Sequence, residues 1–166
     1  NAGNFNFIQN ENISFPQSLT LVNDFSIQAW INPAVSQINS SSYIIYFQET
    51  TPSRNLYLWY KGSTGKLKIN NWELNVGQNT ALSSNASINQ NEWVNVSVIY
   101  DNQTLSLYIN GVLDISLNVT LSVPNISSLT LADHWNSTGT AQFSGLLDDV
   151  HIWSTALSQQ EVQDYM

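Results

Sequence analysis

Residues 143–158 read Phe-Ser-Gly-Leu-Leu-Asp-Asp-Val-His-Ile-Trp-Ser-Thr-Ala-Leu-Ser. Two earlier segments belong with them: residues 25–33, Phe-Ser-Ile-Gln-Ala-Trp-Ile-Asn-Pro, and residues 91–111, which run from Asn-Glu-Trp-Val to Tyr-Ile-Asn-Gly. In each segment apolar and polar residues alternate, which indicates strands with one buried face. Short alternating strands without helix-period patterns predict an all-β protein, an antiparallel β-sandwich of two sheets.

In this order and spacing, the three segments resemble the concanavalin A-like, laminin-G-like jelly-roll domains, including the pentraxin-like branch. The resemblance covers nearly the whole chain. It implies one lectin-like domain over residues 1–166 and a location outside the cell or on its surface, as part of a larger protein. A short terminal helix is expected over 158–165, because Ser158 is followed three residues later by Glu161, the spacing of a capping box.

Two hairpins are predicted. In the first, over 93–110, a turn at 101–104 brings the aliphatic residues of both strands to one side. Its predicted pairs are Tyr100 with Leu105, Val98 with Leu107 and Val96 with Ile109. The second, over 56–70, places Leu56 and Leu58 opposite Leu67 and Ile69 on the core side.

Charge is scarce and mostly negative. Four Lys and Arg stand against twelve Asp and Glu, so the formal net charge is -8. Such a chain lacks the cations that neutralise phosphates, which argues against nucleic acid as a partner. There is no cysteine and no run of apolar residues long enough for a membrane span.

The chain is rich in Asn, Ser and Thr, and it contains eight Asn-X-Ser/Thr sequons. From 22 Asn and 33 Ser and Thr in 166 residues, chance alone gives about four. Both a glycosylated surface and accidental matches remain open. The candidate glycosylation sites are Asn12, Asn39, Asn85, Asn95, Asn102, Asn118, Asn125 and Asn136.

A mixed aromatic and polar face is predicted on the side of the strands that points away from the core. Aromatic rings stack on the C–H faces of sugars, while amides and carboxylates bind hydroxyl groups. This face is therefore a candidate carbohydrate site, although the tryptophans also suit a purely structural role under loops. Its members are Gln28, Trp30, Trp93, Asn95, Tyr108, Asp149 and His151.

A second candidate surface lies on the hairpin over 56–70. There Tyr57 and Trp59 are expected to share the exposed face with Lys61, Lys66 and Lys68. Exposed rings beside the only cations suit an acidic glycan or an acidic neighbouring protein. Lysines that protect an edge hairpin from pairing explain the same residues.

A structural calcium ion is a further candidate. In domains of the resembling family, an acidic residue at the position of Asp148 often helps to hold calcium near the chain ends, and Asn10 and Glu11 would supply further oxygens. The alternation predicts that Asp148 faces the core with Val150 and Ile152. A buried carboxylate that accepts backbone N–H bonds is the alternative.

His134 and Trp135 are candidates for ligand contact at the rim of the sandwich.

Catalysis is not expected, because no strand carries acids at alternating positions and no nucleophile motif is present. We therefore expect a non-catalytic carbohydrate-binding or adhesion module whose partner is a glycan or glycoprotein. The alternative is a structural module of a surface layer, filament or adhesion protein that associates with itself or with other surface proteins. An accessory domain of a glycoside hydrolase is a third reading.

Overall fold

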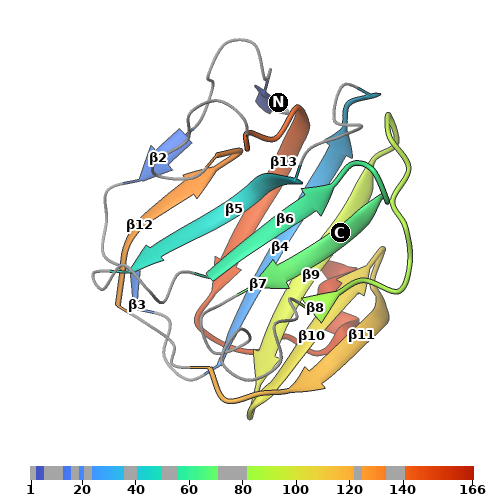
Figure 1. The fold of residues 1–166 in the computed structure, drawn as a ribbon. Helices are drawn as coiled ribbons and strands as arrows, with labels where there is room; N and C mark the ends of the chain where they lie inside the picture. The colour runs from blue at the N-terminus through green and yellow to red at the C-terminus, as the bar shows by residue number, and fades with distance from the viewer. Residues whose placement is uncertain are drawn as a thin grey trace.

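The computed structural model describes residues 3–5, 13–15, 19–20, 24–35, 41–49, 56–70, 82–121, 125–133 and 141–166. They form two β-sheets, and a short helix lies outside one of them (Figure 1). All ladders between the named strands are antiparallel. The predicted fold class, an all-β sandwich of concanavalin A-like type with a short C-terminal helix, is confirmed.

The first sheet has six strands in the order β1-β13-β4-β9-β10-β11. The pairing of β13 with β4 joins segments near the two ends of the sequence, as Figure 1 shows. The strands are β1 (Gly3–Phe5), β4 (Phe25–Pro33), β9 (Val94–Asp101), β10 (Thr104–Ile109), β11 (Val112–Asn118) and β13 (Gly145–Trp153).

The second sheet has seven strands, in the order β2-β12-β5-β6-β7-β8, with β3 also paired to β12. Its strands are β2 (Ile13–Phe15), β3 (Leu19–Thr20), β5 (Ser41–Glu49), β6 (Leu56–Lys61), β7 (Lys66–Asn70), β8 (Leu82–Ser83) and β12 (Asn125–Leu131).

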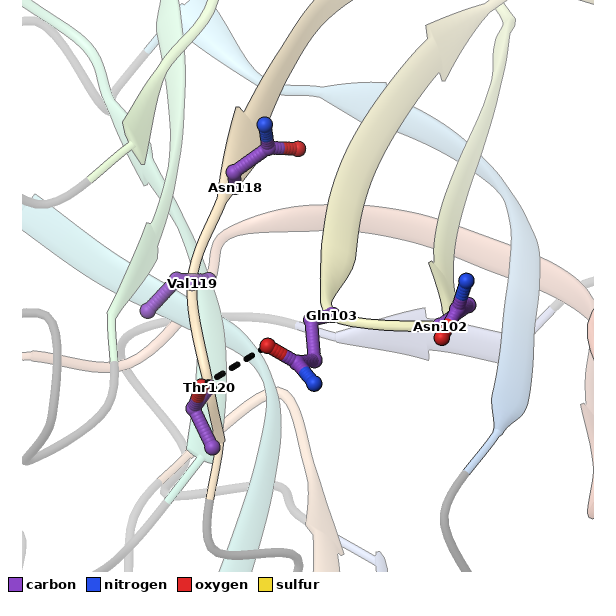
Figure 2. A pocket seen from close by; sticks show the side chains of 5 residues that line it. All are labelled: Asn102, Gln103, Asn118, Val119 and Thr120. Carbon is purple, nitrogen blue, oxygen red and sulfur yellow. Dashed lines mark hydrogen bonds between the residues drawn. The ribbon is translucent and has the colours of Figure 1, made fainter.

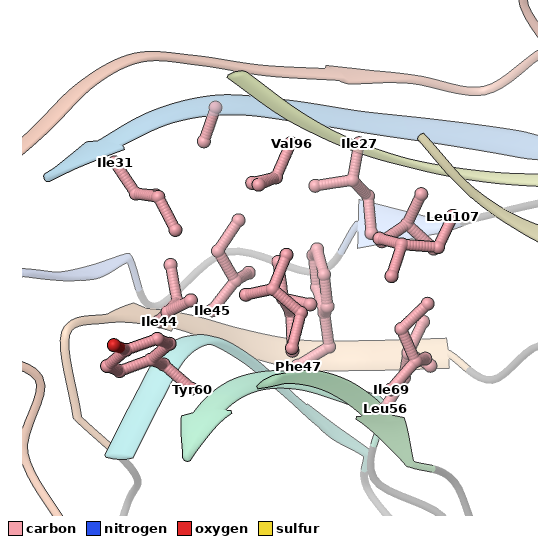
Figure 3. Packing of buried hydrophobic residues seen from close by; sticks show 14 of the residues in the cluster. Ile27, Ile31, Ile44, Ile45, Phe47, Leu56, Tyr60, Ile69, Val96 and Leu107 are labelled. Carbon is pink, nitrogen blue, oxygen red and sulfur yellow. The ribbon is translucent and has the colours of Figure 1, made fainter. Parts of the chain in front are cut away.

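The core lies between the sheets and is built by the alternation seen in the sequence (Figure 3). On β4 the predicted core residues Phe25, Ile27, Ala29 and Ile31 are at most 3% exposed. Facing residues from β5, β6 and β7 close the core from the other side, among them Phe47, Leu58, Tyr60 and Leu67. Each buried aliphatic or aromatic side chain of this size contributes about 1.5–3 kcal/mol.

Both predicted hairpins are confirmed. In the first, Tyr100 pairs with Leu105, Val98 with Leu107 and Val96 with Ile109. Asp101 and Thr104 also pair, so the loop consists of Asn102 and Gln103, both with positive φ. The sequence indicated this register because a slip of one residue would turn every aliphatic side chain to solvent.

The second hairpin joins β6 and β7, and it pairs Leu58 with Ile69 as predicted. Leu67 lies opposite Tyr60 and not opposite Leu56, but all four predicted aliphatic residues line the core. Its outer face carries Tyr57 and Trp59 with the three lysines, as predicted, because Trp59 lies opposite Lys68 and Lys61 opposite Lys66.

Helix α2 (Gln159–Asp164) begins at the predicted capping box. The Ser158 hydroxyl accepts a hydrogen bond from the Glu161 N–H, and the Ser158 backbone N–H donates to the Glu161 carboxylate. The Ser158 backbone N–H and hydroxyl both donate to the Glu161 carboxylate, and these two bonds lower the pKa of Glu161. The helix packs on the outer face of the six-stranded sheet through Val162, which with Leu157 and Ile99 forms a small second core.

In the described part of the chain, no helix has the length and apolarity that a bilayer span requires.

Candidate functional site

The outer face of β5 and β6 carries four aromatic rings in mutual contact: Tyr43, Tyr46, Tyr57 and Trp59. We call these four the aromatic cluster. Tyr57 lies edge-on to Tyr43, with ring centroids 5.2 Å apart, and is stacked on Tyr46 at 5.8 Å. Trp59 is stacked on Tyr43 at 6.4 Å and edge-on to Tyr57 at 6.3 Å. The antiparallel register produces the cluster, because Tyr43 lies opposite Trp59 and Tyr46 opposite Tyr57.

Polar groups from β7 border the aromatic cluster. The Lys68 ammonium lies 5.4 Å from the centre of the Trp59 ring, a cation–π geometry. The Asn70 amide donates to the Tyr57 hydroxyl over 2.6 Å. Burial raises the pKa of both Tyr43 and Tyr57, so both hydroxyls stay protonated at neutral pH. The buried Trp59 indole N–H has no hydrogen-bond partner among the described residues.

Tyr57 and Trp59 were predicted for this surface, whereas Tyr43, Tyr46 and Asn70 were not. The run from Tyr43 to Phe47 looks like a strand in the sequence, but nothing in it shows which strand pairs with it. The irregular register between Tyr43 and Ile45 also breaks the alternation that would have revealed its outer face.

The predicted orientation of Asp148 toward the core is wrong, because β13 contains a β-bulge at this point. The pairing of β13 with β4 shifts register between Asp148 and His151, and Asp149 has a φ of 45°. Asp148 pairs with Trp30, so it lies on the outer face and not with Val150 and Ile152, which pack on the core. Because one extra residue enters the strand, the adjacent residues Asp148 and Asp149 both reach the outer side. The Asp149 N–H donates to the Asp148 carboxylate at 3.0 Å.

The bulge helps to form a hollow of about 250 Å³ on the outer face of the six-stranded sheet, lined by Trp30, Trp93, Asp148 and Asp149. The Trp93 side chain is 40% exposed, and Trp30 is partly buried. Three of these residues were candidates for carbohydrate contact, and the fourth, Asp148, was a candidate for calcium. We call this site the acidic hollow.

Two other residues of the predicted polar face, Gln28 and Asn95, are not exposed. Each is only 1% exposed, because helix α2 covers this part of the sheet. The Gln28 amide donates to the Val162 carbonyl at 2.9 Å and to the Asn95 side-chain oxygen at 3.2 Å. The prediction of an open sugar-binding face is therefore corrected at these two positions. Gln28 and Asn95 form a buried polar contact with the helix. The alternation of apolar and polar residues in β4 and β9 does not reveal this contact.

Tyr108 and His151 lie at the margin of the same helix. Tyr108 is partly buried and packs with Trp153 against the small second core. His151 is exposed, with its ring 5.3 Å from that of Trp153. Trp153 in turn contacts Tyr165, so these rings serve the docking of the C-terminal segment.

The predicted calcium ligands Asn10 and Glu11 lie outside the described residues, as do His134 and Trp135. In the described segments, no group of three His, Cys, Asp or Glu side chains is placed to hold a metal ion. The Asp148 carboxylate accepts the N–H of the adjacent Asp149 on the outer face, and the calcium site stays a prediction.

The first sequon, residues 102–104, and the second, residues 118–120, lie next to each other at one end of the sandwich. They border a hollow of about 420 Å³ that is lined by Asn102, Gln103, Asn118, Val119 and Thr120 (Figure 2). The Thr104 hydroxyl of the first sequon donates to the Asn118 side chain of the second at 3.1 Å. The Thr120 hydroxyl of the second donates to the Gln103 side chain of the first at 3.2 Å. Asn102 and Asn118 are both exposed. Among the other candidates Asn85 is exposed, Asn12, Asn39 and Asn136 lie outside the described residues, and Asn125 begins β12.

Peptide mass spectrometry of the protein made in a glycosylating host is expected to find glycan on Asn102 or Asn118 and none on Asn95. The reason is that a glycan needs an exposed side chain, and Asn95 lies beneath α2. Glycan on Asn95 in a protein whose helix is still docked would contradict this expectation.

The family model described as the concanavalin A-like lectin/glucanases superfamily matches residues 7–163. The chain belongs to this superfamily. No significant sequence match was found among curated proteins.

Several solved structures share this concanavalin A-like fold. Domain 4 of a GH43 extracellular arabinanase from Geobacillus stearothermophilus, solved with arabinotriose, has a TM-score of 0.76 and 23% identity, over 99% of this chain and 75% of that one. The CBM40 module of the Ruminococcus gnavus IT-sialidase, bound to α2,3-sialyllactose, has a TM-score of 0.68 and 15% identity, over 96% and 98%. A heptameric pentraxin from Limulus polyphemus has a TM-score of 0.69 and 20% identity, over 92% and 73%.

Proposed function

We propose that this concanavalin A-like domain is a non-catalytic carbohydrate-binding module whose ligand lies on the aromatic cluster. The proposal is supported by the contacting rings on the outer face of β5 and β6, with Lys68 beside them. Tyr43, Tyr57 and Trp59 are partly exposed and form the surface, while Tyr46 is 5% exposed and supports them from below. Ring faces and edges pack against the C–H groups of a pyranose, and neighbouring amide and ammonium groups donate to its hydroxyl oxygens.

The charges around the cluster favour an anionic saccharide. The four basic residues of the whole chain lie between positions 54 and 68. The three lysines among them lie on β6 and β7, on the same face as Trp59. On a protein of net charge -8 this is the place where a carboxylated or sulfated sugar meets positive charge.

Two structural relatives support this proposal. The arabinanase domain was solved with arabinotriose, and the sialidase module was solved with an anionic sugar, sialyllactose. A domain of the same fold therefore accommodates neutral and anionic oligosaccharides in other proteins.

The absence of catalysis is part of the proposal. The bulge brings the carboxylates of Asp148 and Asp149 to the same hollow. Glycoside hydrolysis needs two carboxyl groups that flank the scissile bond. Adjacent residues of one strand, joined by a hydrogen bond from the Asp149 N–H to the Asp148 carboxylate, approach a ligand from the same side and do not flank it.

We also place this module outside the cell, as part of a larger protein. The exposed sequons at Asn85, Asn102 and Asn118 support this location. The arabinanase that contains the similar domain 4 is described as extracellular, and it carries that domain as one part of a longer enzyme.

Calorimetric titration with a panel of neutral and anionic oligosaccharides tests the function. We expect an anionic member of the panel, such as sialyllactose or an oligogalacturonate, to bind with a dissociation constant in the micromolar to millimolar range. Its affinity should fall with added salt, since screening weakens the attraction of the exposed lysines. If no saccharide of the panel binds at millimolar concentration, the proposed function is wrong.

A further inference from the structure

The acidic hollow on the opposite sheet points to a second ligand. We propose that Trp30, Trp93, Asp148 and Asp149 form a binding site for an organic cation, an ammonium group carried on a small carbon frame. The site lies on the outer face of the six-stranded sheet, whereas the aromatic cluster lies on the other sheet. This inference goes beyond the proposed function and does not depend on it.

The hollow carries negative charge. Asp148 and Asp149 both line it, and no lysine of the described residues is among its lining side chains. Three of the four basic residues of the chain lie on β6 and β7 of the other sheet, and the fourth, Arg54, is outside the described residues. The one described bond to the Asp148 carboxylate comes from the neutral Asp149 N–H. Two neighbouring carboxylates therefore repel one another and gain from any cation that enters.

The other two walls of the hollow are the indole rings of Trp30 and Trp93. Indole rings attract a cation through the negative faces of their π-systems, and tryptophan does so more strongly than tyrosine or phenylalanine. The Trp93 side chain is 40% exposed, so its ring is accessible to a ligand. Aromatic walls combined with carboxylates are the chemistry that recognises alkylated ammonium groups.

The lining and the volume of the hollow suit an organic cation and not a metal ion. Calcium prefers six to eight oxygen ligands. Two of the four side chains that line the hollow are indoles, which offer no oxygen, and no third His, Cys, Asp or Glu of the described residues joins Asp148 and Asp149 as a metal ligand. A volume of about 250 Å³ is below the roughly 300–1,000 Å³ of ordinary small-molecule sites, so it suits one head group and not an extended oligosaccharide.

The same head group occurs in two kinds of ligand, an amino sugar and the side chain of a lysine. Both present an ammonium group on an apolar or weakly polar frame. An anionic saccharide is excluded from this hollow by the two carboxylates, so the two surfaces of the domain are expected to select ligands of opposite charge.

The test follows the six indole N–H resonances of the chain in ¹H–¹⁵N spectra during titration. The probes are tetramethylammonium, glucosamine and Nα-acetyl-lysine methylamide, and the neutral controls are tert-butanol and N-acetylglucosamine. We expect the cations, and not the neutral controls, to shift the Trp30 and Trp93 resonances saturably. Stronger binding of glucosamine would identify an amino sugar as the natural source, and stronger binding of the lysine derivative would identify a peptide.

The variant Asp149→Asn should weaken the binding of the cations about tenfold, because it removes one charged partner of the ammonium group. Asparagine tolerates the positive φ at this position, so the bulge should persist. Asp164→Asn is the matched control, since it removes the same charge from an exposed residue of α2 that does not line the hollow.

Equal affinity in Asp149→Asn and the unmodified protein would overturn the proposal. So would an equal loss in the control variant, which would show a general charge effect, or saturation of the same two resonances by micromolar calcium, which would assign the hollow to a metal ion. Saccharide binding at the aromatic cluster is read separately from the Trp59 resonance, so either proposal can fail without the other.

Discussion

Replacement of Gly145 by alanine is expected to destabilise the domain by roughly 2–6 kcal/mol, the sum of backbone strain and overpacking. Gly145 begins β13 with a φ of 152°, a conformation that residues with a side chain rarely adopt. A Cβ atom there would lie 2.2 Å from the Asn32 carbonyl oxygen and 3.0 Å from the Phe143 ring. Because Gly145 pairs with Pro33 on β4, the clash would separate the two strands at the point where their ladder starts.

Thermal and denaturant unfolding measure this effect. The melting temperature should fall by about 5–20 °C, given about 2–4 °C for each kcal/mol in a chain of this size. Gly111→Ala is the matched control, since Gly111 also has a positive φ, but its Cβ would meet only the flexible side chains of Gln163 and Met166. An equal loss of stability in both variants would contradict the role given to the Asn32 carbonyl.

Replacement of Trp59 by alanine should raise the dissociation constant of the saccharide about 30-fold, since an aromatic hot spot contributes about 2 kcal/mol or more. The substitution removes the stacking partner of Tyr43 and the ring beneath the Lys68 ammonium. The side chain lies on the outer face of β6, so the core between the sheets should remain intact.

Calorimetry of Trp59→Ala and Trp59→Phe distinguishes the loss of a ligand contact from a loss of folded structure. The phenylalanine variant keeps a ring and should recover part of the affinity. Trp93→Ala, which removes an exposed indole from the other sheet, should bind the saccharide like the unmodified protein. If Trp59→Ala binds with unchanged affinity, the aromatic cluster is not the binding surface.

The parts of the fold that the sequence predicted are those where alternation and turn chemistry agree. The hairpin of β9 and β10 is the clearest case, because its register follows from matching two rows of aliphatic residues across a short turn. The helix start at Ser158 also follows from local chemistry, since both halves of the capping box lie within four residues.

The parts that the sequence did not predict depend on contacts between distant segments. A single extra residue in β13 reversed the expected side of Asp148, and bulges leave no clear mark in an apolar–polar pattern. The burial of Gln28 results from α2, whose Val162 carbonyl accepts its amide across 134 positions of sequence. The aromatic cluster needed the pairing of β5 with β6, and a strand-like run does not reveal its partner.

We expect the saccharide to bind on the outer face of β5 and β6. The most direct measurement is a ¹H–¹⁵N titration of the assigned tryptophan indoles with the anionic oligosaccharide that binds best in calorimetry. We expect a saturable shift of the Trp59 resonance, with the Trp30 and Trp93 resonances unchanged. Shifts confined to Trp30 and Trp93, with Trp59 unaffected at saturation, would contradict it.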